Sequence, residues 1–76
     1  MSKDKIQGDV FAILSLNEGE HYMFHKFCEG GALVKKVDGV YELYEIACYC
    51  GTPMFDRHFD TNQVEEIVTM VYQYWN

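Results

Sequence analysis

The chain has 76 residues, of which 49% are hydrophobic and 16% aromatic, so we expect one small domain with a packed core rather than a disordered segment. Its net charge of −6 argues against direct binding to nucleic acid, because lysine and arginine supply the affinity for phosphate. No apolar run approaches the roughly 20 residues of a membrane span, and the amino-terminal residues lack a signal-peptide pattern, so we expect a soluble, cytoplasmic protein that does not bind membranes.

The first predicted element is an amphipathic helix that begins near Lys3 and stops at residues 17–19. Its buried face follows the helical spacing and comprises Ile6, Val10, Ile13 and Leu14. A strand over residues 10–16 is the alternative, since apolar residues also alternate there and Gly8 costs a helix about 1 kcal/mol relative to alanine. We favour the helix.

An antiparallel meander is predicted after this helix. The aromatic-rich segment 20–28 favours a strand, with a short helix as the alternative, and residues 29–31 (Glu-Gly-Gly) favour a turn. Asp38 and Gly39 lie between two valines, and both tolerate the positive φ that a type I′ turn requires at its two central positions. This pair predicts a two-residue β-hairpin.

The hairpin turn also determines the register of its strands. The predicted cross-strand pairs are Val37 with Val40, Lys36 with Tyr41, Lys35 with Glu42, and Val34 with Leu43. The opposite charges of the third pair support this register. The second strand is expected to continue to Cys50, followed by a turn at residues 51–53 and a last strand from Met54 to Phe59.

A carboxy-terminal helix is predicted from about Asn62 to Trp75. Residues 60–62 are all of types that cap helices, and Glu65 and Glu66 fall where the helix dipole favours negative charge. The buried stripe of this helix comprises Val64, Ile67, Val68, Val71 and Trp75. The predicted fold class is therefore α+β: an N-terminal helix, an antiparallel three- to four-stranded β-meander, and a C-terminal helix packed on the sheet, in a single domain over residues 1–76.

Neither face of the predicted sheet is clearly polar. One face would carry Val34, Tyr41, Leu43, Ala47 and Tyr49, and the other would carry Leu33, Val37, Val40, Tyr44, Ile46 and Cys48. An antiparallel sheet with one face in water usually alternates cleanly between apolar and polar residues. We therefore expect the C-terminal helix on one face, and the first helix or a second chain on the other.

Charge and aromatic side chains are concentrated in residues 38–76, which carry the whole net charge of −6 and eight of the twelve aromatic residues. Tyrosine is enriched at protein interfaces, and carboxylates beside it steer a basic partner. We predict a non-enzymatic module that binds a basic protein, or itself, through an acidic, tyrosine-rich hairpin and the C-terminal helix. The candidate binding residues are Tyr41, Glu42, Tyr44, Glu45, Tyr49, Glu65, Glu66, Tyr74 and Trp75.

Two other functions stay open, although we predict no metal, cofactor or catalytic residue. A small acidic inhibitor could occupy the basic nucleic-acid groove of another protein. A zinc site could use His21 and His25, which are expected on one face, together with Cys48 and Cys50, although these two cysteines are closer in sequence than is usual for zinc ligands. A thiol site could instead pair Cys48 with His58.

Overall fold

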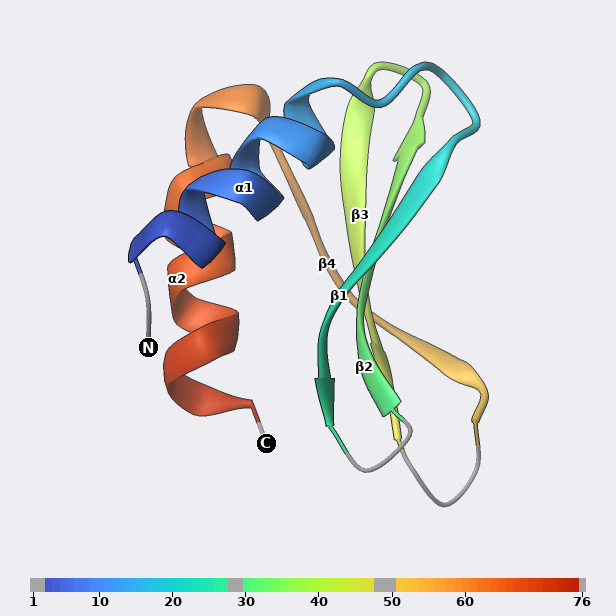
Figure 1. Ribbon diagram of the computed structural model, residues 1–76. Coiled ribbons are helices and arrows are strands. Elements are labelled where there is room, and N and C mark those ends of the chain that lie inside the picture. Colours follow the sequence, from blue (N-terminus) through green and yellow to red (C-terminus); the bar gives the residue numbers. More distant parts are fainter. Residues whose placement is uncertain (1–2, 28–29, 48–50, 76) are drawn as a thin grey trace.

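The structure is a computed structural model that describes residues 3–27, 30–47 and 51–75 (Figure 1). In chain order its elements are helix α1 (Lys3–Leu14), strands β1 (His21–Phe27), β2 (Gly30–Val37), β3 (Val40–Ile46) and β4 (Pro53–Phe59), the 3₁₀ turn η1 (Thr61–Gln63) and helix α2 (Val64–Tyr74). This arrangement confirms the predicted α+β fold, and the meander has four strands. The alternatives of a strand over residues 10–16 and a helix over residues 20–28 are wrong.

The sheet is antiparallel with its strands in the order β1-β2-β3-β4. All four predicted pairs of the central hairpin are confirmed. Its turn residues, Asp38 and Gly39, have φ values of 54° and 80°, as the turn type requires. The carboxylate of Glu18 accepts hydrogen bonds from the backbone N–H groups of both turn residues, which fixes the loop after α1 to the hairpin.

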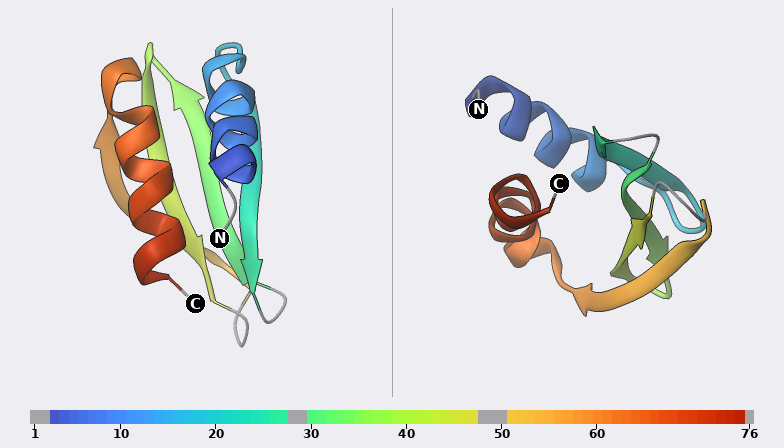
Figure 2. Two further views of the ribbon diagram at one scale, coloured as in Figure 1. Left: turned by 60° about the vertical axis from the view of Figure 1, so that its left-hand side comes forward. Right: turned by 90° about the horizontal axis from the view of Figure 1, so that it is seen from below.

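Both helices cover the same face of the sheet, which we call the inner face (Figure 2). The C-terminal helix lies on the sheet as predicted. Of the two alternatives for the opposite face, a second chain stays a prediction, and the first helix is wrong. The reason is that α1 packs on α2 and beside β1, so its apolar stripe joins the core that α2 already forms with the sheet. No helix of residues 3–27, 30–47 or 51–75 lies on the opposite face, which we call the outer face (Figures 1 and 2).

The core lies between the inner face and the two helices. Its buried members are Ile13, Phe24, Ala32, Val34, Tyr41, Leu43, Phe59, Val64, Ile67, Val68 and Val71. The predicted stripe of α2 is confirmed by four of these residues, and Trp75 packs against the core from the end of the helix. Leu14, which was predicted on the buried face of α1, is instead 44% exposed, so this part of the prediction is wrong.

Two predicted boundaries differ from the structure. Gly30 and Gly31 lie inside β2 rather than in a turn, and Glu29 lies outside the described residues. A Cβ atom on Gly31 would lie 3.1 Å from the backbone oxygen of Phe24, so glycine permits the close approach of β1 to β2. At the far end of the hairpin β3 stops at Ile46, and the rest of its predicted extension, residues 48–50, lies outside the described residues.

The start of the C-terminal helix is tighter than predicted. Residues 61–63 form a 3₁₀ turn, and α2 begins at Val64. The backbone N–H of Asp60 donates to the side-chain oxygen of Gln63 at 2.9 Å, which is the arrangement of a capping box. The predicted N-terminal capping position is therefore correct, although the first turn is not α-helical.

Candidate functional site

The outer face is the first candidate site because side chains alternate between the two sides of a strand. Since Phe24, Val34 and Tyr41 point into the core, their neighbours along the strands point to the uncovered side. The outer face defined in this way comprises His21, Met23, Leu33, Lys35, Val37, Val40, Glu42, Tyr44, Ile46, Phe55 and His58. These residues come from all four strands.

Four apolar side chains form one row across the outer face, which we call the apolar row. Met23 lies opposite Leu33, Leu33 opposite Tyr44, and Tyr44 opposite Phe55. The rings of Tyr44 and Phe55 meet edge to face with their centroids 5.6 Å apart. Leu33 is only 6% exposed at the centre of the row, whereas Met23 and Phe55 are 42% and 50% exposed at its ends. The row therefore presents an apolar strip to solvent.

A second row beside the apolar row is charged. It runs from His21 through Lys35 and Glu42 to His58, again with one residue from each strand. Glu42 accepts a hydrogen bond of 2.8 Å from the Tyr44 hydroxyl, and its other carboxylate oxygen lies 3.3 Å from Nε2 of His58. The hydrogen bond to Glu42 raises the pKa of Tyr44, so this hydroxyl keeps its proton and its orientation.

Among the hairpin candidates that the structure describes, Glu42 and Tyr44 are the two that lie on the outer face. Tyr41 is a core residue, 1% exposed and stacked on Phe59 at 5.3 Å, so it cannot take part in a binding surface. Glu45 is half-buried and shares the inner face with Tyr41 by strand alternation. Tyr49 lies outside the described residues.

The remaining candidate residues belong to α2, on the other side of the molecule. Glu65 and Glu66 are exposed and line an open hollow of about 500 Å³, and the Glu65 carboxylate accepts a hydrogen bond of 3.3 Å from the Gln7 side chain. Tyr74 is 72% exposed, whereas Trp75 packs against the core. The hairpin and α2 therefore do not form the single acidic, tyrosine-rich surface that the sequence suggested.

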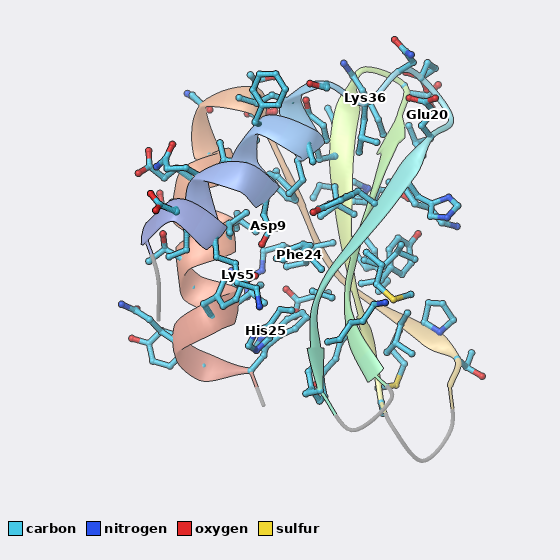
Figure 3. The ribbon with its side chains drawn as sticks, in the orientation of Figure 1. Lys5, Asp9, Glu20, Phe24, His25 and Lys36 are labelled. Carbon is cyan, nitrogen blue, oxygen red and sulfur yellow. The ribbon has the colours of Figure 1, made fainter. Side chains whose placement is uncertain are left out.

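A buried carboxylate between the helices and β1 is a feature that sequence reasoning missed. Asp9 of α1 is 7% exposed, and its two oxygens accept hydrogen bonds from Tyr22 of β1 at 2.7 Å and from Tyr72 of α2 at 2.5 Å. Figure 3 shows Asp9 pointing from α1 into the space beside Phe24. In the sequence, Asp9 lies between Ile6 and Ile13 on the apolar stripe of α1, and this position indicates that its side chain is buried.

This cluster, which we call the Asp9 clamp, consists of Asp9, Tyr22 and Tyr72. Burial and the hydrogen bond to Asp9 raise the pKa of Tyr22 to about 12, and the same two causes raise the pKa of Tyr72. Both hydroxyls therefore remain protonated donors at neutral pH. Each of the two hydroxyls donates a hydrogen bond to the Asp9 carboxylate, so the clamp joins α1, β1 and α2. It has the character of a structural cluster.

His25 lies beside the clamp at an irregularity in β1. Its φ of 51° and the shift in register between Phe24 and Phe27 mark a β-bulge. Figure 3 shows both Phe24 and His25 pointing toward the helices. The His25 ring meets Tyr72 edge to face at 4.6 Å, and its Nε2 donates to the backbone carbonyl of Trp75 at 2.6 Å. His25 thereby ties β1 to the end of α2.

The bulge also separates the two histidines of the alternative zinc site. His21 lies on the outer face and His25 on the inner side, so the expectation that they share a face is wrong. Residues 3–27, 30–47 and 51–75 contain no group of three histidine, cysteine, aspartate or glutamate side chains that could hold a metal. The other two predicted ligands, Cys48 and Cys50, lie outside this part of the chain, as does the cysteine of the predicted thiol site.

Comparison of the chain with family models, with curated proteins and with solved structures found no match. Among the described residues, no helix is long and apolar enough to span a bilayer. The function must therefore be argued from the two features described above: a polar cluster whose members bond one another, and an apolar row that no other element covers.

Proposed function

We propose that the protein is a non-enzymatic, cytoplasmic interaction module that binds a basic protein through the outer face of its sheet. The observation that carries this proposal is the apolar row, since Met23 and Phe55 at its ends are half-exposed although a core is available on the other side of the sheet. Contiguous apolar patches on small proteins commonly mark interaction sites. Aromatic and methionine side chains are also enriched in the centres of interfaces.

The charged row suits the edge of such an interface. Glu42 is already bonded to Tyr44 and lies near His58, and the Lys35 ammonium lies 5.2 Å from the centre of the Tyr44 ring. A partner that covers this row would meet a Glu42 carboxylate that already accepts a hydrogen bond, which lowers the cost of removing it from water. The net charge of −6 favours a basic partner by accelerating its approach.

The test compares two variants that carry equally polar substitutions. Met23→Ser/Phe55→Ser removes the exposed ends of the apolar row, and Phe11→Ser removes a phenylalanine that is 74% exposed on α1. Proteins captured by the wild-type chain are purified, and their direct binding is measured with each variant. We expect the outer-face variant to weaken binding about 30-fold or more, as for the loss of an interface hot spot, and Phe11→Ser to leave binding unchanged.

Added salt tests the charge component separately. The association rate with a basic partner should fall as salt rises, because screening weakens the attraction between the two net charges. Equal binding by the wild type and the outer-face variant would contradict the proposed surface. Binding that salt does not change would contradict a basic partner while leaving the surface in place.

A further inference from the structure

Strand β4 is the open edge of the sheet. Among the described strands it pairs with β3 alone, and every residue from Pro53 to His58 is exposed. The other edge strand, β1, is flanked by α1, whereas no helix is in comparable contact with β4 among the described residues. An edge strand presents unpaired N–H and C=O groups that can pair with a strand of another chain. The edge of β4 is thus the place where the sheet can be extended.

A bulge in β4 determines which of its side chains share a face. Leu43 and Tyr44 are adjacent in β3, but they pair with Arg57 and Phe55, so β4 has one extra residue at Asp56. Phe55 and His58 consequently both lie on the outer face, opposite Tyr44 and Glu42. In the same way Met54 and Phe59 both lie on the inner side. In a regular strand, residues an odd number of positions apart point to opposite faces, so without the bulge neither Phe55 and His58 nor Met54 and Phe59 would share a face.

We infer that a second copy of this chain pairs antiparallel with β4 about a two-fold axis between Asp56 and Arg57, which joins two sheets into one of eight strands. In this register Phe55 lies opposite His58 of the second copy, and both belong to the outer face. Met54 lies opposite Phe59 of the second copy, and both belong to the inner side. A slip by one residue would place Phe55 opposite Arg57, whose side chains belong to different faces.

Charge supports the same register. Asp56 and Arg57 form an ion pair within one chain, and they are the two residues at the centre of the proposed interface. Across the two-fold axis, the carboxylate of each copy lies opposite the guanidinium of the other, so two complementary pairs form at once. Pro53, which has no N–H group, falls at the end of the paired stretch, where no ladder hydrogen bond is lost.

The dimer would also enlarge the outer face. The apolar row ends at Phe55 in one chain, and the proposed pairing places the row of the second copy next to it. This inference does not rest on the proposed binding of a basic partner, because the charges at positions 56 and 57 can be changed while the apolar row stays intact. Failure of the charge-reversal test therefore leaves the proposed binding of a basic partner unaffected.

Charge reversal provides the experiment. The molar mass of the wild-type chain and of the variants Asp56→Arg and Arg57→Asp is measured by sedimentation over a dilution series. We expect the wild type to form dimers, and each variant to raise the dimer dissociation constant about tenfold or more, because two attractive pairs become two repulsive ones. Glu66→Arg, which changes the net charge as Asp56→Arg does but lies exposed on α2, should dimerise like the wild type.

Mixing the two variants distinguishes this interface from a general effect of charge. When Asp56→Arg is combined with Arg57→Asp, both cross-axis pairs are again complementary, so the mixture should form a heterodimer more tightly than either variant forms a homodimer. Circular dichroism checks that each variant is folded. A wild type that is monomeric throughout the dilution series, a variant that dimerises normally, or a mixture that stays monomeric would each overturn the inference.

Discussion

The two faces of the sheet are built from the same alternating strands, yet they differ in what covers them. On the inner face Val34, Tyr41 and Leu43 are at most 1% exposed, because two helices pack on them. On the outer face Leu33 is nearly as buried, and it lies between Met23 and Tyr44 of the neighbouring strands. Burial alone therefore does not distinguish a packed core from a surface strip, whereas the presence of a second layer does.

Polar groups follow the same division. On the inner side, the carboxylate of Asp9 is enclosed and receives hydrogen bonds from two tyrosines on different elements. On the outer face, Glu42 and Tyr44 form a similar pair within one strand, and His58 lies beside them near solvent. The inner cluster stabilises the contact between helices and sheet, while the outer pair leaves the surface available to another molecule.

The largest expected effect compares one leucine from each face. Leu43→Ala should lower the free energy of unfolding by about 4 kcal/mol, because the substitution leaves a cavity between two layers that relax little. Leu33→Ala should cost only about 2 kcal/mol, since the neighbouring side chains on the outer face can move into the space. Urea denaturation of both variants checks this difference. Equal losses would show that the outer face is packed as rigidly as the core.

The Asp9 clamp should make stability depend on pH in the alkaline range. The pKa of Tyr22 is about 12 in the folded protein and 10.0 in an exposed tyrosine, so the folded state holds this proton more tightly. Its contribution is therefore complete below pH 10.0 and is lost as pH rises toward 12. Denaturation at a series of pH values should show this decline, and Tyr22→Phe should make it shallower.

A matched hydroxyl provides the control for the clamp. Tyr22→Phe should lower the free energy of unfolding by about 1 to 2 kcal/mol at neutral pH, because the buried Asp9 loses one of its donors. Tyr44→Phe on the outer face should cost less than Tyr22→Phe, since Glu42 can be solvated instead. A larger loss for Tyr44→Phe than for Tyr22→Phe would reverse the contrast between the two faces.

The smallest expected effect is on the stability of the outer-face variant. Met23→Ser/Phe55→Ser should change the free energy of unfolding by less than about 1 kcal/mol, because both side chains are half-exposed. Thermal denaturation measures this change in the protein used for the binding experiment. A loss of several kcal/mol would mean that these side chains stabilise the fold, and that any loss of binding could not be assigned to the surface.

Local signals in the sequence were sufficient for the elements and for the central hairpin. The Asp38-Gly39 turn predicts the register of β2 and β3 because backbone conformation at two residues sets every pair that follows. The boundaries were less accurate where distant contacts decide them. Gly31 resembled a turn residue, but it lies in β2, where a Cβ atom would be in tight contact with the backbone of β1.

Of the candidate site, the sequence supplied Glu42 and Tyr44 but could not tell which face Tyr41 would occupy. Alternation shows that Tyr41 and Tyr44 point to opposite sides, and only the placement of the helices shows which side is covered. The two bulges were also beyond local reasoning. They turn His25 away from His21 and bring Phe55 and His58 onto one face, because they arise from how neighbouring strands pair rather than from the residues themselves.

The sequence by itself thus determined the order of the elements, the hairpin register and the two-sided apolar character of the strands, since each depends on periodicity and backbone preference over a few residues. Only the tertiary structure decided that both helices share one face and leave the apolar row uncovered. That choice depends on α1 packing against α2 and on Asp9 meeting Tyr22 and Tyr72. Asp9, Tyr22 and Tyr72 are far apart in the chain, so only the complete fold brings them into contact.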